Sequence, residues 1–229
     1  MELFYIFAAI TLVCVIAFLV VRIKKGGIIA MLLKTLASVM FIATGLVGAS
    51  KCGMGTETIF IMLGLLFGLI GDILLDLKYC HAEDEYTYTN AGMLSFGLGH
   101  IMYFVATVLI LRLYTDLSWL FVLASAGGAA LITVLIMMVS KKMLDFGRYF
   151  YQSVAYTFVL SFMVCLTIIT TIYYPEFWRM MAGIVLIFLS DLVLSFIYFG
   201  GKENSGLFIS VNHIVYYAGQ LMIAMFLFV

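Results

Sequence analysis

Long apolar runs separated by short polar breaks form the main pattern of this chain. The runs lie near residues 2–21, 28–48, 58–77, 90–111, 117–139, 150–172, 179–199 and 207–229. A helix that crosses a bilayer needs about 20 consecutive, mostly apolar residues, and each run has that length. The breaks between them carry glycine and charge, and the longest covers residues 78–89. The pattern therefore predicts an all-α integral membrane protein with eight transmembrane helices.

Composition and charge agree with that pattern. Hydrophobic residues make up 66% of the 229 residues and charged residues only 10%, whereas a soluble domain is about half apolar and about a quarter charged. The 12 basic and 12 acidic residues give a net charge of zero, which indicates no nucleic-acid partner. One proline and no low-complexity linker predict a single domain over residues 1–229 in a lipid bilayer.

Positive charges predict the orientation of the chain in the membrane. Loops after the first, third, fifth and seventh runs hold eight Lys and Arg residues, against three in the other loops. Because cytoplasmic loops carry the excess of positive charge, both termini are expected outside. The acidic start MELFYIF, with no cleavage site after the first run, predicts a retained helix. We expect a multi-pass protein of the bacterial cytoplasmic membrane.

Two parts of the chain resemble each other. The segment from Gly64 to Leu75 matches the segment from Gly183 to Leu194, and each has an aspartate eight residues after its glycine. In the next run of each half, Gly99-His100-Ile101-Met102-Tyr103 matches Asn212-His213-Ile214-Val215-Tyr216. This indicates a parallel duplication of a four-helix unit, with halves 1–115 and 116–229. Chance resemblance between apolar helices is the alternative, because Leu and Ile match easily.

Ionisable residues inside the apolar runs are the candidates for function. Charged groups in hydrocarbon cost at least a few kcal/mol each. Counting ~1.5 Å per residue from the helix ends places five of them in one slab, about 8–15 Å from the cytoplasmic side. They are Lys34, Asp72, His100, Asp191 and His213. Asp76 is close enough to the interface to be solvated, and Lys34 is either a counter-ion or a ligand.

The spacing of these residues places them on shared helix faces. Gly64, Gly68, Asp72 and Asp76 recur every four residues, so small residues and carboxylates share one stripe. Small residues at that spacing let helices approach closely. His213, Tyr216, Tyr217 and Gln220 likewise share a face of the last run.

Two carboxylates in a low dielectric can share a proton, so that one acts as an acid while the other activates water. Acid-assisted hydrolysis of an acetal-like ether or of a peptide bond follows from that chemistry. The sequence has no Gly-x-Ser-x-Gly motif, and it has three histidines without a His-Glu-x-x-His motif. We therefore expect no metal and no cofactor.

Four short motifs carry a family resemblance. Gly71-Asp72, Gly99-His100-x-x-Tyr103, Ser190-Asp191-x-x-Leu194 and Tyr216-Tyr217-x-x-Gln220 resemble those of the YhhN-like lysoplasmalogenases. The resemblance extends from Lys34 to Gln220. It implies a hydrolase that cleaves the vinyl-ether bond of lysoplasmalogens, giving a fatty aldehyde and glycerophosphocholine or glycerophosphoethanolamine. Asp72 and Asp191 would be the catalytic residues. The expected binding residues for the lysophospholipid are Lys34, His100, Tyr103, Ser190, His213, Tyr216, Tyr217 and Gln220.

The expected site opens to the cytoplasmic half of the bilayer, with a polar mouth joined to an apolar slot. The lipid chain would run past Phe67, Phe104 and Phe188 toward the membrane centre. Two alternatives stay open. A proton-coupled transporter or lipid carrier would use the same Asp and His residues. An intramembrane aspartyl protease would need a Tyr-Asp partner motif, whereas here the second aspartate follows Ser190.

Overall fold

The computed structural model describes residues 2–116 and 119–228, and these form eight helices long and apolar enough to cross a membrane. The eight predicted helices are therefore confirmed. The long helices are α1 (Glu2–Lys24), α2 (Gly27–Cys52), α3 (Thr56–Leu77), α4 (Glu85–Tyr114), α5 (Trp119–Ser140), α6 (Phe150–Tyr173), α7 (Trp178–Phe199) and α8 (Gly206–Phe226). Short 3₁₀ turns at Ala82–Asp84, Gly147–Tyr149 and Pro175–Phe177 precede α4, α6 and α7. The predicted start at residue 117 and end at residue 229 lie outside the described residues.

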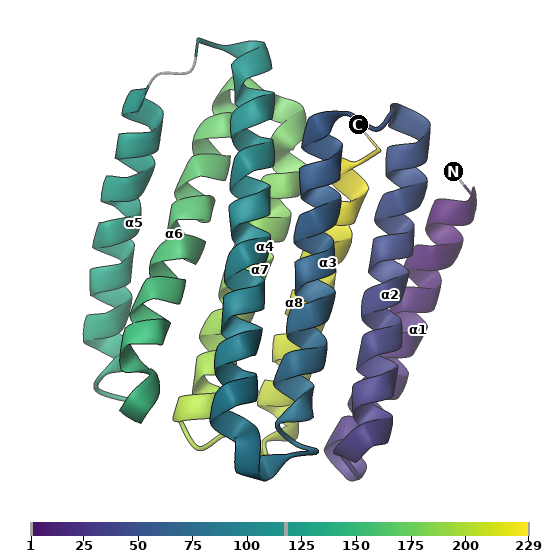
Figure 1. Cartoon of the computed structure of the whole chain (residues 1–229), viewed down its shortest axis with the longest axis vertical. Coiled ribbons are helices and arrows are strands. Elements are labelled where there is room, and N and C mark those ends of the chain that lie inside the picture. The colour runs from purple at the N-terminus through teal and green to yellow at the C-terminus, as the bar shows by residue number, and fades with distance from the viewer. Residues whose placement is uncertain (1, 117–118, 229) are drawn as a thin grey trace.

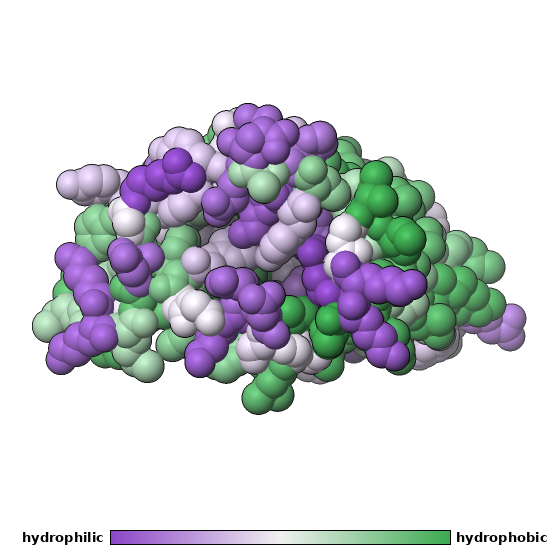
Figure 2. Space-filling view, turned by 90° about the horizontal axis from the view of Figure 1, so that it is seen from below, coloured by the Kyte–Doolittle hydropathy of each residue, from purple (hydrophilic) through white to green (hydrophobic). Residues whose placement is uncertain are grey.

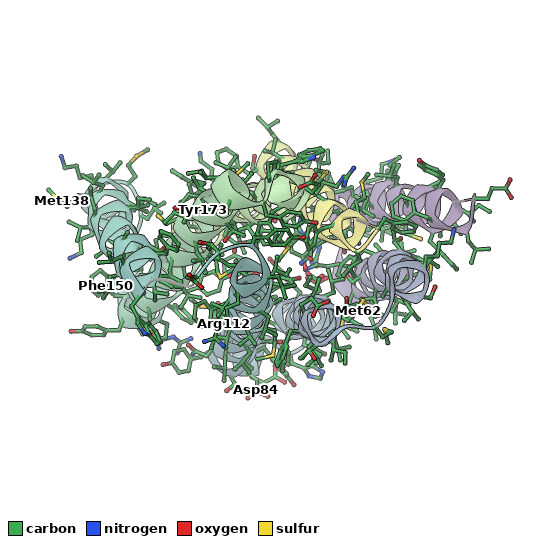
Figure 3. The ribbon with its side chains drawn as sticks, turned by 90° about the horizontal axis from the view of Figure 1, so that it is seen from above. Met62, Asp84, Arg112, Met138, Phe150 and Tyr173 are labelled. Atoms are coloured by element: carbon green, nitrogen blue, oxygen red, sulfur yellow. The ribbon has the colours of Figure 1, made fainter. Side chains whose placement is uncertain are left out.

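The helices run up and down in sequence order (Figure 1). Each packs against its successor except α4, whose main neighbour on that side is α6 instead of α5. Helices α2, α3 and α4 form one layer and α1, α8 and α7 the other, while α5 and α6 extend the bundle at one edge (Figure 3). The α1–α2, α3–α4, α5–α6 and α7–α8 connections lie together at the bottom of Figure 1, here named the lower end. The beginning and the end of the described chain both lie at the upper end.

The outer surface of the bundle is apolar along the length of its helices. Leu94, Leu131, Ile172 and Leu207 are each more than 60% exposed. Exposed apolar surface on this scale needs lipid rather than water around it. Seen from below, hydrophilic residues gather at the lower end and hydrophobic residues cover the flanks (Figure 2). The chain is therefore a multi-pass membrane protein.

Glycines let the helices that carry the polar residues approach closely. The ring of Tyr103 on α4 occupies the position that a Cβ at Gly64 on α3 would take. Gly183 on α7 and Gly219 on α8 face each other, and an added Cβ on either would lie 2.8–2.9 Å from the other's carbonyl oxygen. The small-residue stripe predicted for α3 is confirmed as a buried face, since Gly64, Gly68 and Asp72 are all buried.

Several helices extend a few residues beyond the predicted runs, and the end of α1 and the start of α4 change the connections at the lower end. Helix α1 continues to Lys24, so Arg22 belongs to its last turn instead of to a loop. The turn into α2 is then very short, and Gly26 and Gly27 make it with φ angles of 63° and 70° that favour glycine. Helix α4 begins at Glu85, so the polar break predicted for residues 78–89 is shorter than expected.

The proposed duplication stays a prediction, although equivalent contacts occur in both halves. Ser38 on α2 donates a hydrogen bond to Asp72 on α3, and Tyr156 on α6 donates one to Asp191 on α7. His100 and His213 each pair their Nδ1 with the carbonyl oxygen four residues earlier. A repeated four-helix unit would produce such matched contacts.

Candidate active site

A polar cavity of about 390 Å³ opens at the lower end, between the α1–α2 and α7–α8 connections. It is visible as the hollow among hydrophilic residues in Figure 2. Five helices, α1, α2, α3, α7 and α8, contribute polar side chains to its wall. These side chains include Arg22, Lys34, Asp72, Asp76, Ser190, Asp191, Asn212, His213 and Tyr216. Because the two predicted catalytic aspartates line the same cavity, one substrate can contact both.

A chain of buried ion pairs lies along one wall of this cavity. The Nζ of Lys34 is 3.2 Å from a carboxylate oxygen of Asp72 and 3.2 Å from one of Asp76. Arg22 pairs with the other oxygen of Asp76. All four side chains are at least nine-tenths buried. Two cations and two carboxylates balance, which lowers the cost of holding charges in a low-dielectric interior.

The positions of Asp76 and Arg22 differ from those expected from the sequence. Asp76 was expected to be solvated at the interface, but it is only 3% exposed and contacts both cations. Arg22 was expected in a cytoplasmic loop, but its guanidinium lies over the ring of Tyr79, 4.3 Å from the centroid, and reaches into the cavity. A long arginine at a helix end usually extends toward water. Here the buried carboxylate of Asp76 on α3 turns it inward.

Three donors surround Asp72. Ser38 and Tyr216 donate hydrogen bonds of 2.6 and 2.9 Å to its Oδ2, and Lys34 contacts its Oδ1. Hydroxyl and ammonium groups at these distances stabilise the ionised form of a carboxyl group. These three contacts favour the carboxylate form of Asp72 against the cost of burying a charge.

A second layer holds those donors in place. Tyr217 donates to the backbone oxygen of Lys34 at 3.0 Å and lies 3.1 Å from the Ser38 hydroxyl. Gln220 donates to the Tyr216 hydroxyl at 3.0 Å, and Tyr103 lies 3.4 Å from the Gln220 amide oxygen. Tyr103, Tyr217 and Gln220 do not line the cavity. Their contacts fit residues that position Asp72 and its donors, rather than residues that touch a substrate.

Asp191 has a different environment. Its Oδ2 accepts a hydrogen bond of 2.7 Å from Tyr156. Among the described residues, the cations of the site pair with Asp72 and Asp76 and not with Asp191. A carboxyl group without a counter-ion in a low dielectric favours its neutral, protonated form. The two aspartates are thus unequal, although they occupy equivalent positions in the two halves of the sequence.

Ser190 and Asn212 tie α7 to α8 beside Asp191. The Asn212 amide donates to the backbone oxygen of Ser190 at 2.8 Å and to its hydroxyl at 2.9 Å. The Ser190 hydroxyl is also 3.1 Å from the Asn212 backbone oxygen. These reciprocal contacts fix the helix pair at the depth of Asp191. Their hydrogen-bonding groups face each other more than they face the cavity.

The two histidines differ in position. His213 lines the cavity, with its ring edge against Phe18. His100 does not line it and lies between the rings of Tyr103 and Tyr156, with centroids 5.9 and 6.3 Å away. Equal depth along the membrane therefore did not bring all five ionisable groups into one cavity, because His100 faces α6 and not α8.

Lys78 adds a cation beside the cavity, just beyond the end of α3. Its ammonium lies 3.2 Å from the ring centroid of Tyr198, which lines the cavity. Burial lowers the pKa of Lys78 to about 8, against the opposing effect of the negative charges of Glu85 and Asp76. The lower end of the site is thus rich in cations held against aromatic rings.

The YhhN family model matches residues 29–227, which is most of the chain. The chain belongs to the YhhN family. Neither a search of curated proteins nor a search of solved structures gives a match. The family resemblance carried by the motifs around Asp72, His100, Asp191 and Tyr216 is therefore confirmed.

The YhhN match includes the site except for residues 22–27, at the end of α1 and in the turn after it. Lys34, Asp72, Asp191 and Tyr216 fall inside residues 29–227, whereas Arg22 lies before the match begins. Helix α1 nevertheless contributes Arg22 to the cavity wall and packs against α2 and α8. In this YhhN protein the helix outside the matched segment completes the ion-pair chain.

Proposed function

We propose that this protein is a lysoplasmalogenase, which hydrolyses the vinyl-ether bond of a lysoplasmalogen. One observation carries the proposal: two aspartates in unequal environments line a single cavity that opens at the polar end of a membrane bundle. Membership of the YhhN family is consistent with a hydrolase of this kind. A lipid substrate also accounts for a site placed below the membrane surface.

The two aspartates suit the two demands of vinyl-ether hydrolysis. The alkene carbon must receive a proton, and the positive charge that develops on the neighbouring carbon and ether oxygen must be stabilised. Asp191, which lacks a counter-ion, is the proposed proton donor. Asp72, held as a carboxylate by Lys34, Ser38 and Tyr216, is the proposed stabiliser of the oxocarbenium charge.

Water completes the reaction. A water molecule attacks the oxocarbenium carbon, and the Asp191 carboxylate formed in the first step accepts one of its protons. The resulting hemiacetal breaks its bond to the glycerol oxygen, which takes a proton as the carbonyl forms. The products are a fatty aldehyde and a glycerophospho-alcohol, and the two carboxyl groups return to their starting states. One water is consumed, and no other reactant is required.

Arg22 and Lys34 suit the phosphate of such a substrate. Both line the cavity on the side of the lower end, where the headgroup of a lipid in that leaflet would lie. Cationic side chains bind phosphate through charge-assisted hydrogen bonds. We propose that the headgroup enters the cavity from the lower end, so that the ether bond reaches the depth of Asp72 and Asp191.

Purified protein in detergent, incubated with a lysoplasmalogen, should release a fatty aldehyde that can be measured by mass spectrometry. Asp72→Asn and Asp191→Asn should each reduce the rate by about 10²–10⁴, the usual contribution of a catalytic acid or base. The exposed Asp116 offers a matched control, and Asp116→Asn should retain the wild-type rate. Near wild-type turnover in either site variant would refute the mechanism. A transporter or lipid carrier would release no aldehyde under these conditions.

A further inference from the structure

A second, apolar groove meets the polar cavity at Asp191. The groove has a volume of about 80 Å³, against about 390 Å³ for the cavity. Side chains of α4, α5, α6 and α7 form most of its walls, including Met93, Ile136, Leu160, Phe188, Leu192 and Phe199. Leu75, Phe96, Asp191, Leu194 and Tyr198 line both spaces. The Asp191 carboxyl group therefore stands at the boundary between a polar and an apolar compartment.

The groove differs from the slot expected from sequence. Of the three phenylalanines expected along the lipid chain, only Phe188 lines it. Phe104 lines a separate apolar hollow of about 140 Å³ with His100, Phe158 and Phe162. Phe67 lines neither space. The cause is the packing of α4, whose Phe104 ring lies against Phe162 on α6 at 5.6 Å between centroids, away from Asp191.

We infer that this groove binds the single hydrocarbon chain of a lysophospholipid, at the end of the chain next to the reacting bond. The inference rests on the proposed function and adds the subsite in which the chain of that substrate binds. A vinyl-ether bond joins a polar glycerol phosphate to an apolar chain. If that bond lies at Asp191, its two ends need environments of opposite polarity that meet there, and the cavity and the groove provide them.

The same geometry selects a lipid with one chain. A second acyl chain on the glycerol would have to enter the cavity, beside the buried charges of Arg22, Lys34 and Asp76. Apolar groups gain nothing by contact with charges, and the charges lose hydration without gaining a partner. The groove, at about 80 Å³, is the smaller space by a wide margin. The glycerol position that carries a free hydroxyl is therefore the one that faces the ions.

Small residues keep the groove open close to Asp191. Thr157 follows the Tyr156 that bonds Asp191, and Ser195 lies one helical turn after Asp191. A phenylalanine at either position would occupy the space proposed for the first carbons of the chain. Ala155 is exposed on the same helix as Thr157 and lines neither space, so Ala155→Phe is a matched control.

Binding of a non-hydrolysable probe separates this inference from the proposed reaction. The probe is a lysophospholipid with a saturated ether bond, prepared with a long alkyl chain and, for comparison, with only a methyl group in place of that chain. Thr157→Phe and Ser195→Phe should weaken binding of the long-chain probe about tenfold, the loss expected when about two methylene groups are kept out of the groove. Binding of the methyl-ether probe, which has no chain to enter the groove, should change less than binding of the long-chain one, and Ala155→Phe should change neither. Equal effects on both probes, or no effect, would overturn the inference.

Photolabelling of the wild-type protein gives a test that does not depend on variants folding. A lysophospholipid with a photoreactive group on the first carbons of its chain should label Met93, Tyr156 or Leu192, as mapped by peptide mass spectrometry. Labelling centred on Phe104, Phe158 and Phe162, or no labelling, would contradict the groove. If the labels fall in the groove but no aldehyde is released from lysoplasmalogen, the groove stands and the proposed reaction fails. If aldehyde is released but the labels fall elsewhere, the reaction stands and the groove fails.

Discussion

Lys34 and Asp72 form a buried ion pair, with 3.2 Å between the ammonium nitrogen and Oδ1 of the carboxylate. Both side chains are largely buried, with 6% and 3% of their surface exposed, so water hydrates either charge poorly. The pair is extended by Asp76 and Arg22 into a chain that joins α1, α2 and α3. A buried pair of this kind is costly to break, because removal of one partner leaves an uncompensated charge.

Lys34→Met should therefore destabilise the protein, by about 3–5 kcal/mol in the free energy of unfolding. Aldehyde release should fall with it, since Asp72 loses its ammonium partner. In the double variant Lys34→Met/Asp72→Asn, stability should partly recover because Arg22 and Asp76 remain paired, but activity should stay low. Unfolding in mixed micelles and aldehyde assays measure the two effects. Wild-type stability and activity in Lys34→Met would show that Lys34 neither balances the buried carboxylates nor supports catalysis through Asp72.

Tyr156 should act on the rate through Asp191. Tyr156→Phe removes the hydroxyl that donates a hydrogen bond to that carboxyl group. A lost hydrogen bond of about 1–1.5 kcal/mol corresponds to a roughly tenfold lower kcat. KM should change little, because Tyr156 does not line the headgroup cavity and phenylalanine keeps the ring that lines the apolar groove. Tyr151 lies on the same helix and is 81% exposed, so Tyr151→Phe is the control. A change in KM alone would show that Tyr156 serves binding instead.

The sequence was sufficient to predict the eight helices and to single out Asp72, Asp191, Lys34 and Tyr216. Hydropathy and helical period determine where a membrane helix runs and which of its residues share a face. They do not determine which neighbour that face meets. His100 shares its depth with the aspartates but faces Phe104 and the α6 side of the bundle. Its position depends on how α4 packs.

Tyr156 and Arg22 were missed for related reasons. Tyr156 stands in an apolar run as one aromatic residue among many, and only its 2.7 Å contact with Asp191 on another helix distinguishes it. Arg22 stands at a helix end, where an arginine ordinarily meets water or lipid headgroups. The signal that could have found Arg22 is Asp76, since a carboxylate buried near the interface needs a cation.

Arg22 should contribute to recognition of the substrate phosphate. Arg22→Gln should raise KM for lysoplasmalogen about tenfold, the order expected for one charge-assisted hydrogen bond. The effect should disappear with an alkenylglycerol that lacks the phosphate. Arg112 is exposed near the upper end, and Arg112→Gln should leave both substrates unaffected. An equal loss with both substrates would show that Arg22 only supports the structure through Asp76.

Lys78 should give the protein a specific dependence of stability on pH. Its pKa is lowered by burial from 10.5 to about 8. Between these two values the unfolded chain binds more protons at this site than the folded one, so stability should rise as pH increases from about 8 to 10.5. The Lys78→Met variant should not show this rise in stability with pH. Melting temperatures of both proteins across this range measure the difference, and parallel curves would contradict the assignment.

The orientation of the bundle decides which leaflet supplies the substrate. The connections at the lower end and the adjoining helix ends hold eight Lys and Arg residues, against three at the upper end. Because the cavity opens at the lower end, the positive-inside rule predicts that the substrate is drawn from the cytoplasmic leaflet. Single cysteines in a variant without the native cysteines test this directly. Lys51 lies at the upper end of α2, and Lys202 lies in the α7–α8 connection.

In intact cells, a membrane-impermeant thiol reagent should label Lys51→Cys and not Lys202→Cys. Permeabilised cells provide the control, because both positions are exposed and should then react. The expected pattern would place the ion-lined mouth in the cytoplasm, so that Arg22 and Lys34 meet phospholipid headgroups of the inner leaflet. The reverse pattern would place the mouth outside the cell. The reaction at Asp72 and Asp191 could then still occur, but its substrate would have to come from the outer leaflet.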